Sequence, residues 1–298
     1  MVMERWETPD QDFLEIHRLQ GTPGKPRLLI LHGLEGSPRS HYARGMLAEA
    51  TRRGWSAEVL VFRSCGAELN RLVRSYHSGE TTDLAFVVDR LAEEAPDTPL
   101  FITGVSLGGN VLLKWLGERG DDLPPQLRAA VAISVPFDLA RSTRHIDRGF
   151  SRVYQAHFLR SLKRKAHEKR RRFPDAMSAP AIDRARTLYQ YDDAVTAPVH
   201  GFRDADDYYQ RSSSIRWIER IRLPTLLLSA VDDPFLPPDV LDEVAAIARR
   251  TPALHLEFPD RGGHVGFIGG RAPWRPFYYA EWRALTFLEQ HVSDERDG

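Results

Sequence analysis

The chain is 298 residues long and 42% hydrophobic, which is enough to bury the core of one large α/β domain, with or without an insertion. Its 41 basic and 41 acidic side chains cancel, so the overall charge gives no reason to expect a nucleic acid or an anionic membrane as partner. No apolar run approaches the roughly 18 residues that cross a bilayer, which predicts a protein without an integral membrane span.

Short apolar runs alternate with helical patterns along the chain. The sequence predicts strands at 13–19, 27–32, 55–62, 100–103, 129–135, 225–230 and 254–258, and helices at 40–53, 84–91, 110–116, 240–249 and 279–289. Continuous apolar runs such as 27–32 suit strands that are covered on both faces. The alternation therefore predicts an α/β fold with a mostly parallel central sheet and helices on both faces.

The stretch from Pro136 to Arg222 interrupts this alternation, because it is far longer than the roughly 2–6 residues of a usual connection. Its aromatic residues and helical patterns predict a folded insertion. An insertion at this point would lie over the strand ends where α/β sheets bind ligands, so we expect a helical lid. Residues 1–135 and 223–298 would then form the core, and residues 136–222 the lid.

The most informative motif is Gly104-Val105-Ser106-Leu107-Gly108, which lies between an apolar run and a helical pattern. Gly-x-Ser-x-Gly in this setting is typical of a nucleophile elbow, a tight strand-to-helix turn that presents a serine hydroxyl to a base. Gly104 and Gly108 remove side chains where the strained turn meets neighbouring elements. Ser106 is therefore the predicted nucleophile, although the motif alone would also suit a plain Gly/Ser turn.

A serine nucleophile needs a histidine base and an acid that orients it, in the chain order Ser, Asp or Glu, His. The apolar run 225–230 is followed closely by Asp232, Asp233 and Pro234. Because Pro234 biases the preceding residue toward an extended conformation, we favour Asp233 as the acid and keep Asp232 as the alternative. His264, in a glycine-rich loop before the C-terminal helix, is the predicted base.

Acyl chemistry at a serine also needs backbone N–H donors for the oxyanion that develops. The amide of Leu107, directly after the nucleophile, is one predicted donor. The amide of Leu34 is the other, because His32-Gly33-Leu34-Glu35-Gly36 follows an early strand. No cofactor is expected, and no cluster of His or Cys has the spacing of metal ligands.

Four further features have two interpretations each. Cys65 is the only cysteine, which predicts a reducing, cytoplasmic setting and a structural thiol rather than a nucleophile. Asp192 and Asp193 are expected to tie down the lid rather than bind a metal. The basic run 163–172 predicts a solvated helix face, with contact to anionic lipid as the alternative. An amphipathic stripe could line an acyl pocket or form lid core: Phe150, Tyr154, Phe158, Leu159 and Leu162.

Taken together, these motifs resemble the YheT-like branch of the α/β-hydrolases (type 4) over nearly the whole chain. The matching stretches are 32–37, 76–83, 104–110, 232–235 and 263–267, with further matches in the insertion. One departure is Arg63-Ser64-Cys65, where the family often has Arg-Gly-Cys. The resemblance implies the α/β-hydrolase fold and, by similarity to eukaryotic members, activity on acylglycerol or phospholipid esters.

The predicted function is hydrolysis of short- or medium-chain carboxylic esters, with acylglycerols among the candidates, through a Ser-Asp-His triad and an acyl-enzyme intermediate. The expected partner is a small-molecule acyl ester, and peripheral contact with lipid is left open. Acyl transfer by the same triad is one alternative. A non-catalytic binding protein with a hydrolase fold is the other, and it is disfavoured because every triad member is present in the sequence.

Overall fold

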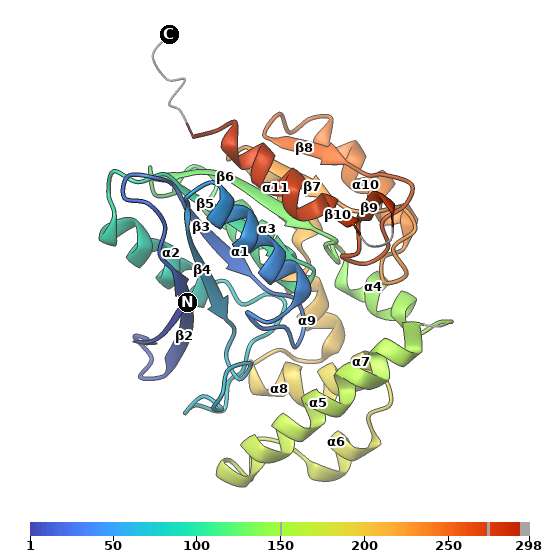
Figure 1. The fold of residues 1–298 in the computed structure, drawn as a ribbon. Helices are drawn as coiled ribbons and strands as arrows, with labels where there is room; N and C mark the ends of the chain where they lie inside the picture. The colour runs from blue at the N-terminus through green and yellow to red at the C-terminus, as the bar shows by residue number, and fades with distance from the viewer. Residues whose placement is uncertain (150, 273–274, 293–298) are drawn as a thin grey trace.

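The computed structural model describes residues 1–149, 151–272 and 275–292, and its centre is an eight-stranded sheet (Figure 1). In spatial order the strands are β1 (Val2–Glu7), β2 (Phe13–Leu19), β4 (Ser56–Val61), β3 (Arg27–Leu31), β5 (Leu100–Val105), β6 (Leu127–Ile133), β7 (Thr225–Leu228) and β8 (Leu254–Glu257). The pairs β1–β2 and β2–β4 are antiparallel, and the six strands from β4 to β8 pair in parallel. The prediction of a mostly parallel sheet is therefore confirmed.

Helices cover both faces of this sheet, as predicted (Figure 1). On one face pack α2 (Thr82–Glu94), α3 (Leu107–Arg119) and α10 (Pro238–Ala248), and on the other α1 (His41–Arg52) and α11 (Tyr279–Glu289). Leu29 and Leu31 of β3 belong to the first core, whereas Leu28 and Ile30 belong to the second. Because successive side chains of a strand point to opposite faces, a strand between two cores is apolar throughout.

Residues 136–222 leave the sheet after β6 and return to it at β7. They form α4 (Leu139–Ile146), α5 (Ser151–Arg172), α6 (Ala179–Arg184), α7 (Leu188–Tyr191), a π-helical turn (Asp192–Thr196), α8 (Ala197–Val199) and α9 (Ala205–Ser212). Figure 1 shows α5, α6 and α8 beyond one end of the sheet. A separate small core, which includes Leu159, Ile182 and Val195, holds these helices together. The segment therefore has its own packing.

Three strands were not predicted. The edge strand β1 buries only Trp6. Because a strand that buries one side chain needs no apolar pattern, its sequence carries no strand signal. The second sheet is a hairpin of β9 (Ile268–Ala272) and β10 (Arg275–Tyr278), and Gly269 and Gly270 weaken its strand signal.

Among the helices of the described residues, none is both long and apolar enough to cross a bilayer.

Candidate active site

Ser106 stands in the turn between β5 and α3 with φ of 54° and ψ of −118°. This backbone conformation is strained for a residue with a side chain, at a cost of about 1–3 kcal/mol, and such strain often marks functional positions. A Cβ on Gly104 would lie 2.5 Å from the carbonyl oxygen of Gly108, and one on Gly108 would lie 2.6 Å from that of His32. The close backbone approach therefore requires glycine on both sides of the turn.

A continuous chain of hydrogen bonds joins the three side chains that the sequence predicted as a triad. The Nδ1–H of His264 donates to Oδ2 of Asp233 at 2.8 Å, and its Nε2 lies 3.1 Å from Oγ of Ser106. With the proton on Nδ1, Nε2 is free to accept the serine hydroxyl proton. The Asp233 side chain is fully buried, and its other oxygen accepts the backbone N–H of Phe235 at 2.8 Å. The arrangement can therefore pass a proton from Ser106 to His264.

The neighbouring carboxylate, Asp232, has a different task. Its Oδ1 accepts the backbone N–H groups of Gly262 and Gly263, each at 2.8 Å, so it holds the loop that precedes His264. The Asp232 side chain does not hydrogen-bond to His264 in this arrangement, because Oδ2 of Asp233 takes the Nδ1–H. The structure thus brings Asp233 to the histidine and Asp232 to its loop, a distinction that spacing could not make.

Two further residues support the histidine loop and were missed by sequence reasoning. Ser134, which follows β6 with a φ of 52°, accepts the N–H of Val265 through its hydroxyl at 3.3 Å. The Nε2 of His41 lies 3.1 Å from the carbonyl oxygen of Val265. Ser134 falls inside the predicted strand 129–135 and His41 inside the predicted helix 40–53, so neither pattern indicated a place at the site.

The loop formed by residues 32–36 lies against Ser106, and we call it the oxyanion loop because it carries Leu34, one of the two predicted oxyanion donors. A Cβ on Gly33 would be 3.3 Å from Cβ of Ser106. Neither the amide of Leu34 nor that of Leu107 donates a hydrogen bond to another described backbone or side-chain group. Both residues line the same cavity as Ser106, so the two amides predicted as oxyanion donors are available at the site.

His32 anchors the start of the oxyanion loop as a neutral imidazole. Its Nδ1 lies 2.7 Å from the carbonyl oxygen of Gly33, and its Nε2 accepts the backbone N–H of Phe62 at 3.1 Å. Protonation of Nε2 would remove this acceptor. Complete burial lowers the pKa of His32 from near 6.5 to about 4. The folded protein therefore holds this ring neutral at pH values where the unfolded chain would protonate it.

We expect this depressed pKa to make the protein less stable in mild acid. The unfolded chain binds the proton first, so stability present above pH 6.5 is lost as pH falls toward 4. Between pH 7 and pH 5 the contribution of His32 to the free energy of unfolding should fall by about 2 kcal/mol. Urea titrations at both pH values measure it. His32→Asn, which does not titrate, should be less stable at pH 7 but show a flatter pH dependence; equal slopes would contradict the assignment.

A cavity of about 360 Å³ opens at Ser106 between the sheet and residues 136–222. Its apolar lining includes Leu139, Ile146, Phe158, Leu162, Met177 and Leu236. Phe158 and Leu162 thus face the cavity, Leu159 belongs to the core of the helical segment, and Tyr154 is half exposed against the ring of Phe235. Phe150 lies outside the described residues. The predicted stripe therefore serves both as cavity wall and as core.

Cys65 and its neighbour Ser64 are held by local contacts and do not belong to the chain of hydrogen bonds at Ser106. Burial raises the pKa of the Cys65 thiol to about 12, so the thiol stays protonated and is a poor nucleophile. Ser64 has φ of 65°, a left-handed conformation that a glycine at this position would adopt without strain. Its amide donates to Oδ1 of Asn70 at 2.6 Å, which helps to hold this conformation. The departure from the family motif is therefore accommodated.

The two aspartates of the helical segment tie it together, as predicted. Asp192 accepts from the hydroxyls of Thr196 at 2.6 Å and Tyr209 at 2.7 Å, and Asp193 accepts the N–H of Ala205 at 3.1 Å. Burial raises the pKa of Asp192 to about 6. Over the described part of the chain, His, Cys, Asp and Glu form no group that could hold a metal ion.

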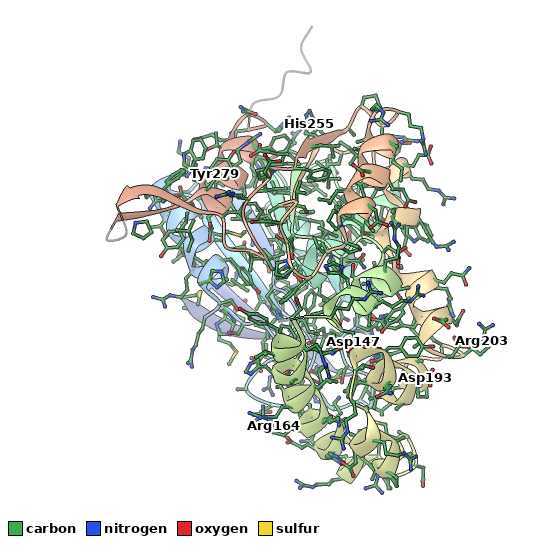
Figure 2. All side chains as sticks on the ribbon, turned by 90° about the vertical axis from the view of Figure 1, so that its right-hand side faces the viewer. Asp147, Arg164, Asp193, Arg203, His255 and Tyr279 are labelled. Carbon is green, nitrogen blue, oxygen red and sulfur yellow. The ribbon has the colours of Figure 1, made fainter. Side chains whose placement is uncertain are left out.

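The basic run is only partly a solvated face. Arg164 lies exposed on the outer side of α5 (Figure 2). Lys165 instead points inward, and Lys169 is 2% exposed and donates to the carbonyl oxygens of Asn70, Leu72 and Arg74. Burial lowers the pKa of Lys169 to about 8. The expectation of a solvated helix face is wrong for these two lysines, because every third or fourth residue of a helix shares the inner face.

The model of the alpha/beta hydrolase fold family matches residues 26–270. The chain belongs to the α/β-hydrolase family. The YheT protein of Escherichia coli is 40% identical over 96% of this chain and 85% of its own length. The monoacylglycerol lipase of Saccharomyces cerevisiae is 30% identical, and the alignment covers 89% of this α/β-hydrolase and 59% of the lipase. Phospholipase ABHD3 of Mus musculus is 29% identical, and the alignment covers 84% of this α/β-hydrolase and 60% of the phospholipase.

Solved structures show the same fold. The esterase Pf2001 of Pyrococcus furiosus superposes with a TM-score of 0.62 at 16% identity, covering 98% of this α/β-hydrolase and 93% of the esterase. The family match and the curated relatives show that the chain is a hydrolase of the esterase and lipase type.

Proposed function

We propose that this α/β-hydrolase is a serine esterase that uses Ser106, His264 and Asp233 as its triad. The single observation that supports it most is the hydrogen-bond chain from Ser106 through His264 to buried Asp233, at the wall of a cavity. The Ser106 oxygen would attack the ester carbonyl while its proton moves to Nε2 of His264. That proton then passes to the departing alcohol, which leaves an acyl-enzyme. Water then attacks the acyl carbonyl while His264 takes one of its protons, and this proton passes to the Ser106 oxygen as the acid departs.

The oxyanion formed in each step would be held by the amides of Leu34 and Leu107. In comparable sites one such donor contributes about 2.7–4 kcal/mol to the transition state. Both amides are free of other described acceptors, and both residues line the cavity with Ser106. No cofactor takes part in this scheme.

The proposed substrates are esters with a short or medium acyl chain. The cavity of about 360 Å³ is near the lower end of the roughly 300–1,000 Å³ of small-molecule sites, and residues 136–222 contribute apolar side chains to its lining, among them Leu139, Phe158 and Met177. We therefore propose that these residues act as a lid over a core of residues 1–135 and 223–298. The lipase and phospholipase names of two relatives extend the candidates to acylglycerols and include peripheral contact with lipid. Cys65, as a free thiol, fits the proposed cytoplasmic location.

A series of p-nitrophenyl esters of increasing acyl length tests the proposal with the purified protein. We expect kcat/KM to be highest for short or medium chains and to fall for long ones that exceed the cavity. Added glycerol distinguishes hydrolysis from the alternative of acyl transfer, because a transferase would form glycerol esters in place of free acid. Absence of turnover across the series would contradict the proposed function, and a maximum at long chains would contradict the proposed chain length.

A further inference from the structure

One residue of the basic run connects the helical lid to the oxyanion loop. Nζ of Lys165, in the middle of α5, donates to Oε1 of Glu35 at 2.7 Å. The two side chains are 18% and 9% exposed, so this pair is mostly shielded from water. Breaking a shielded ion pair leaves one charge without compensation, which is far more disruptive than breaking an exposed pair. The contact thus links two segments 130 residues apart.

Glu35 itself adopts a conformation that its contacts must maintain. Its φ is 54°, in the left-handed region that residues with a side chain rarely occupy. The phenol of Tyr76 accepts the N–H of Glu35 at 2.9 Å and donates to the Glu35 carboxylate at 2.8 Å. Because such conformations persist only when the surroundings determine them, Tyr76 and Lys165 together hold the Glu35 backbone.

The neighbouring residues of the oxyanion loop are tied as well. The N–H of Gly33 donates to the hydroxyl of Tyr42 at 2.8 Å, and the N–H of Gly36 donates to the carbonyl oxygen of Gly33 at 3.0 Å. Among Gly33, Leu34, Glu35 and Gly36, the amide of Leu34 is the one without an acceptor in the described part of the chain. The ties on both sides of Leu34 therefore fix the direction in which its N–H points.

We propose that Lys165 and Glu35 are a positioning pair that makes the orientation of the Leu34 amide depend on the seating of α5. This inference rests on the proposed function, since it assigns the Leu34 amide to the oxyanion. Both residues also line the cavity, but this effect on the Leu34 amide requires no contact between either side chain and the substrate. When α5 is seated, Lys165 neutralises Glu35 and the loop holds its strained conformation. When α5 moves away, Glu35 loses its cation and the loop can relax, so catalysis is tuned to the closed lid.

The test replaces Lys165 by methionine, which keeps the aliphatic stem and removes the charge. We expect kcat on a short p-nitrophenyl ester to fall about 10-fold with KM little changed, because a displaced oxyanion donor acts on the transition state. The rate of labelling by a fluorophosphonate should fall in parallel. Lys165→Arg should restore most of kcat. Lys163→Met is the matched control, since this lysine of α5 donates to the carbonyl oxygen of Asp183 inside the lid.

A double variant separates coupling from a general loss of stability. If the pair acts as a unit, Glu35→Gln combined with Lys165→Met should lower kcat no further than the worse single variant does. Additive losses, a kcat for Lys165→Met equal to that of Lys163→Met, or a rise in KM alone would each overturn the proposal. A parent protein that a fluorophosphonate does not label would instead overturn the proposed function. Should Glu35→Gln fail to fold, the Lys165→Met and Lys165→Arg comparison decides.

Discussion

Ser106→Ala is expected to lower kcat for ester hydrolysis by at least about 10⁴-fold, the largest effect among single changes in this chain. Alanine cannot form the acyl-enzyme, so what remains is the rate that binding and the oxyanion donors give to direct attack by water. Labelling by a fluorophosphonate should vanish, because the probe bonds covalently to the activated serine. Mass spectrometry of the labelled parent should find the adduct on the peptide that contains Ser106.

The matched control is Ser229→Ala. Ser229 is buried after β7, and its hydroxyl has no hydrogen-bond partner among the described residues, so removing it should change neither labelling nor kcat substantially. Thermal unfolding of both variants establishes that they are folded. Full labelling of Ser106→Ala would contradict the assignment of the nucleophile, whatever its effect on turnover.

The contrast between strands and loops explains what the sequence could predict. The seven predicted strands follow from short apolar runs and the helices of the core from apolar periodicity, and each has a counterpart in the structure. The apolar runs are continuous where both faces of the sheet are covered. The apolar signal is weak in β1, which buries one side chain, and in the hairpin of β9 and β10.

In the candidate site, too, only part of the arrangement could be predicted from the sequence. Chain order and strand ends were enough to predict Ser106, Asp233 and His264, which the structure brings within hydrogen-bonding distance. The supports of the site could not be predicted, because they join residues far apart in sequence through backbone groups. Ser134 meets Val265 across 131 residues, and Lys165 meets Glu35 across 130. Such contacts depend on how loops are folded, which side-chain patterns do not encode.

The second large effect is expected from Asp233→Asn, which should lower kcat by about 10⁴-fold, as the loss of the triad acid does in comparable enzymes. An asparagine amide can donate to Nδ1 of His264, which favours the tautomer with the proton on Nε2. That nitrogen then cannot accept the proton of Ser106. The change is nearly isosteric, so the fold should survive, and steady-state kinetics together with thermal unfolding measure both effects.

Asp232→Asn is the control that decides between the two adjacent carboxylates. Its side-chain carbonyl can still accept the N–H groups of Gly262 and Gly263, so the loop before His264 keeps its tie and kcat should fall far less than in Asp233→Asn. Asp232→Ala removes both bonds and should lower kcat further, because the loop that carries His264 loosens while the acid stays in place. If Asp232→Asn were as damaging as Asp233→Asn, the histidine would be oriented by Asp232 in solution. The division between acid and loop support would then be wrong.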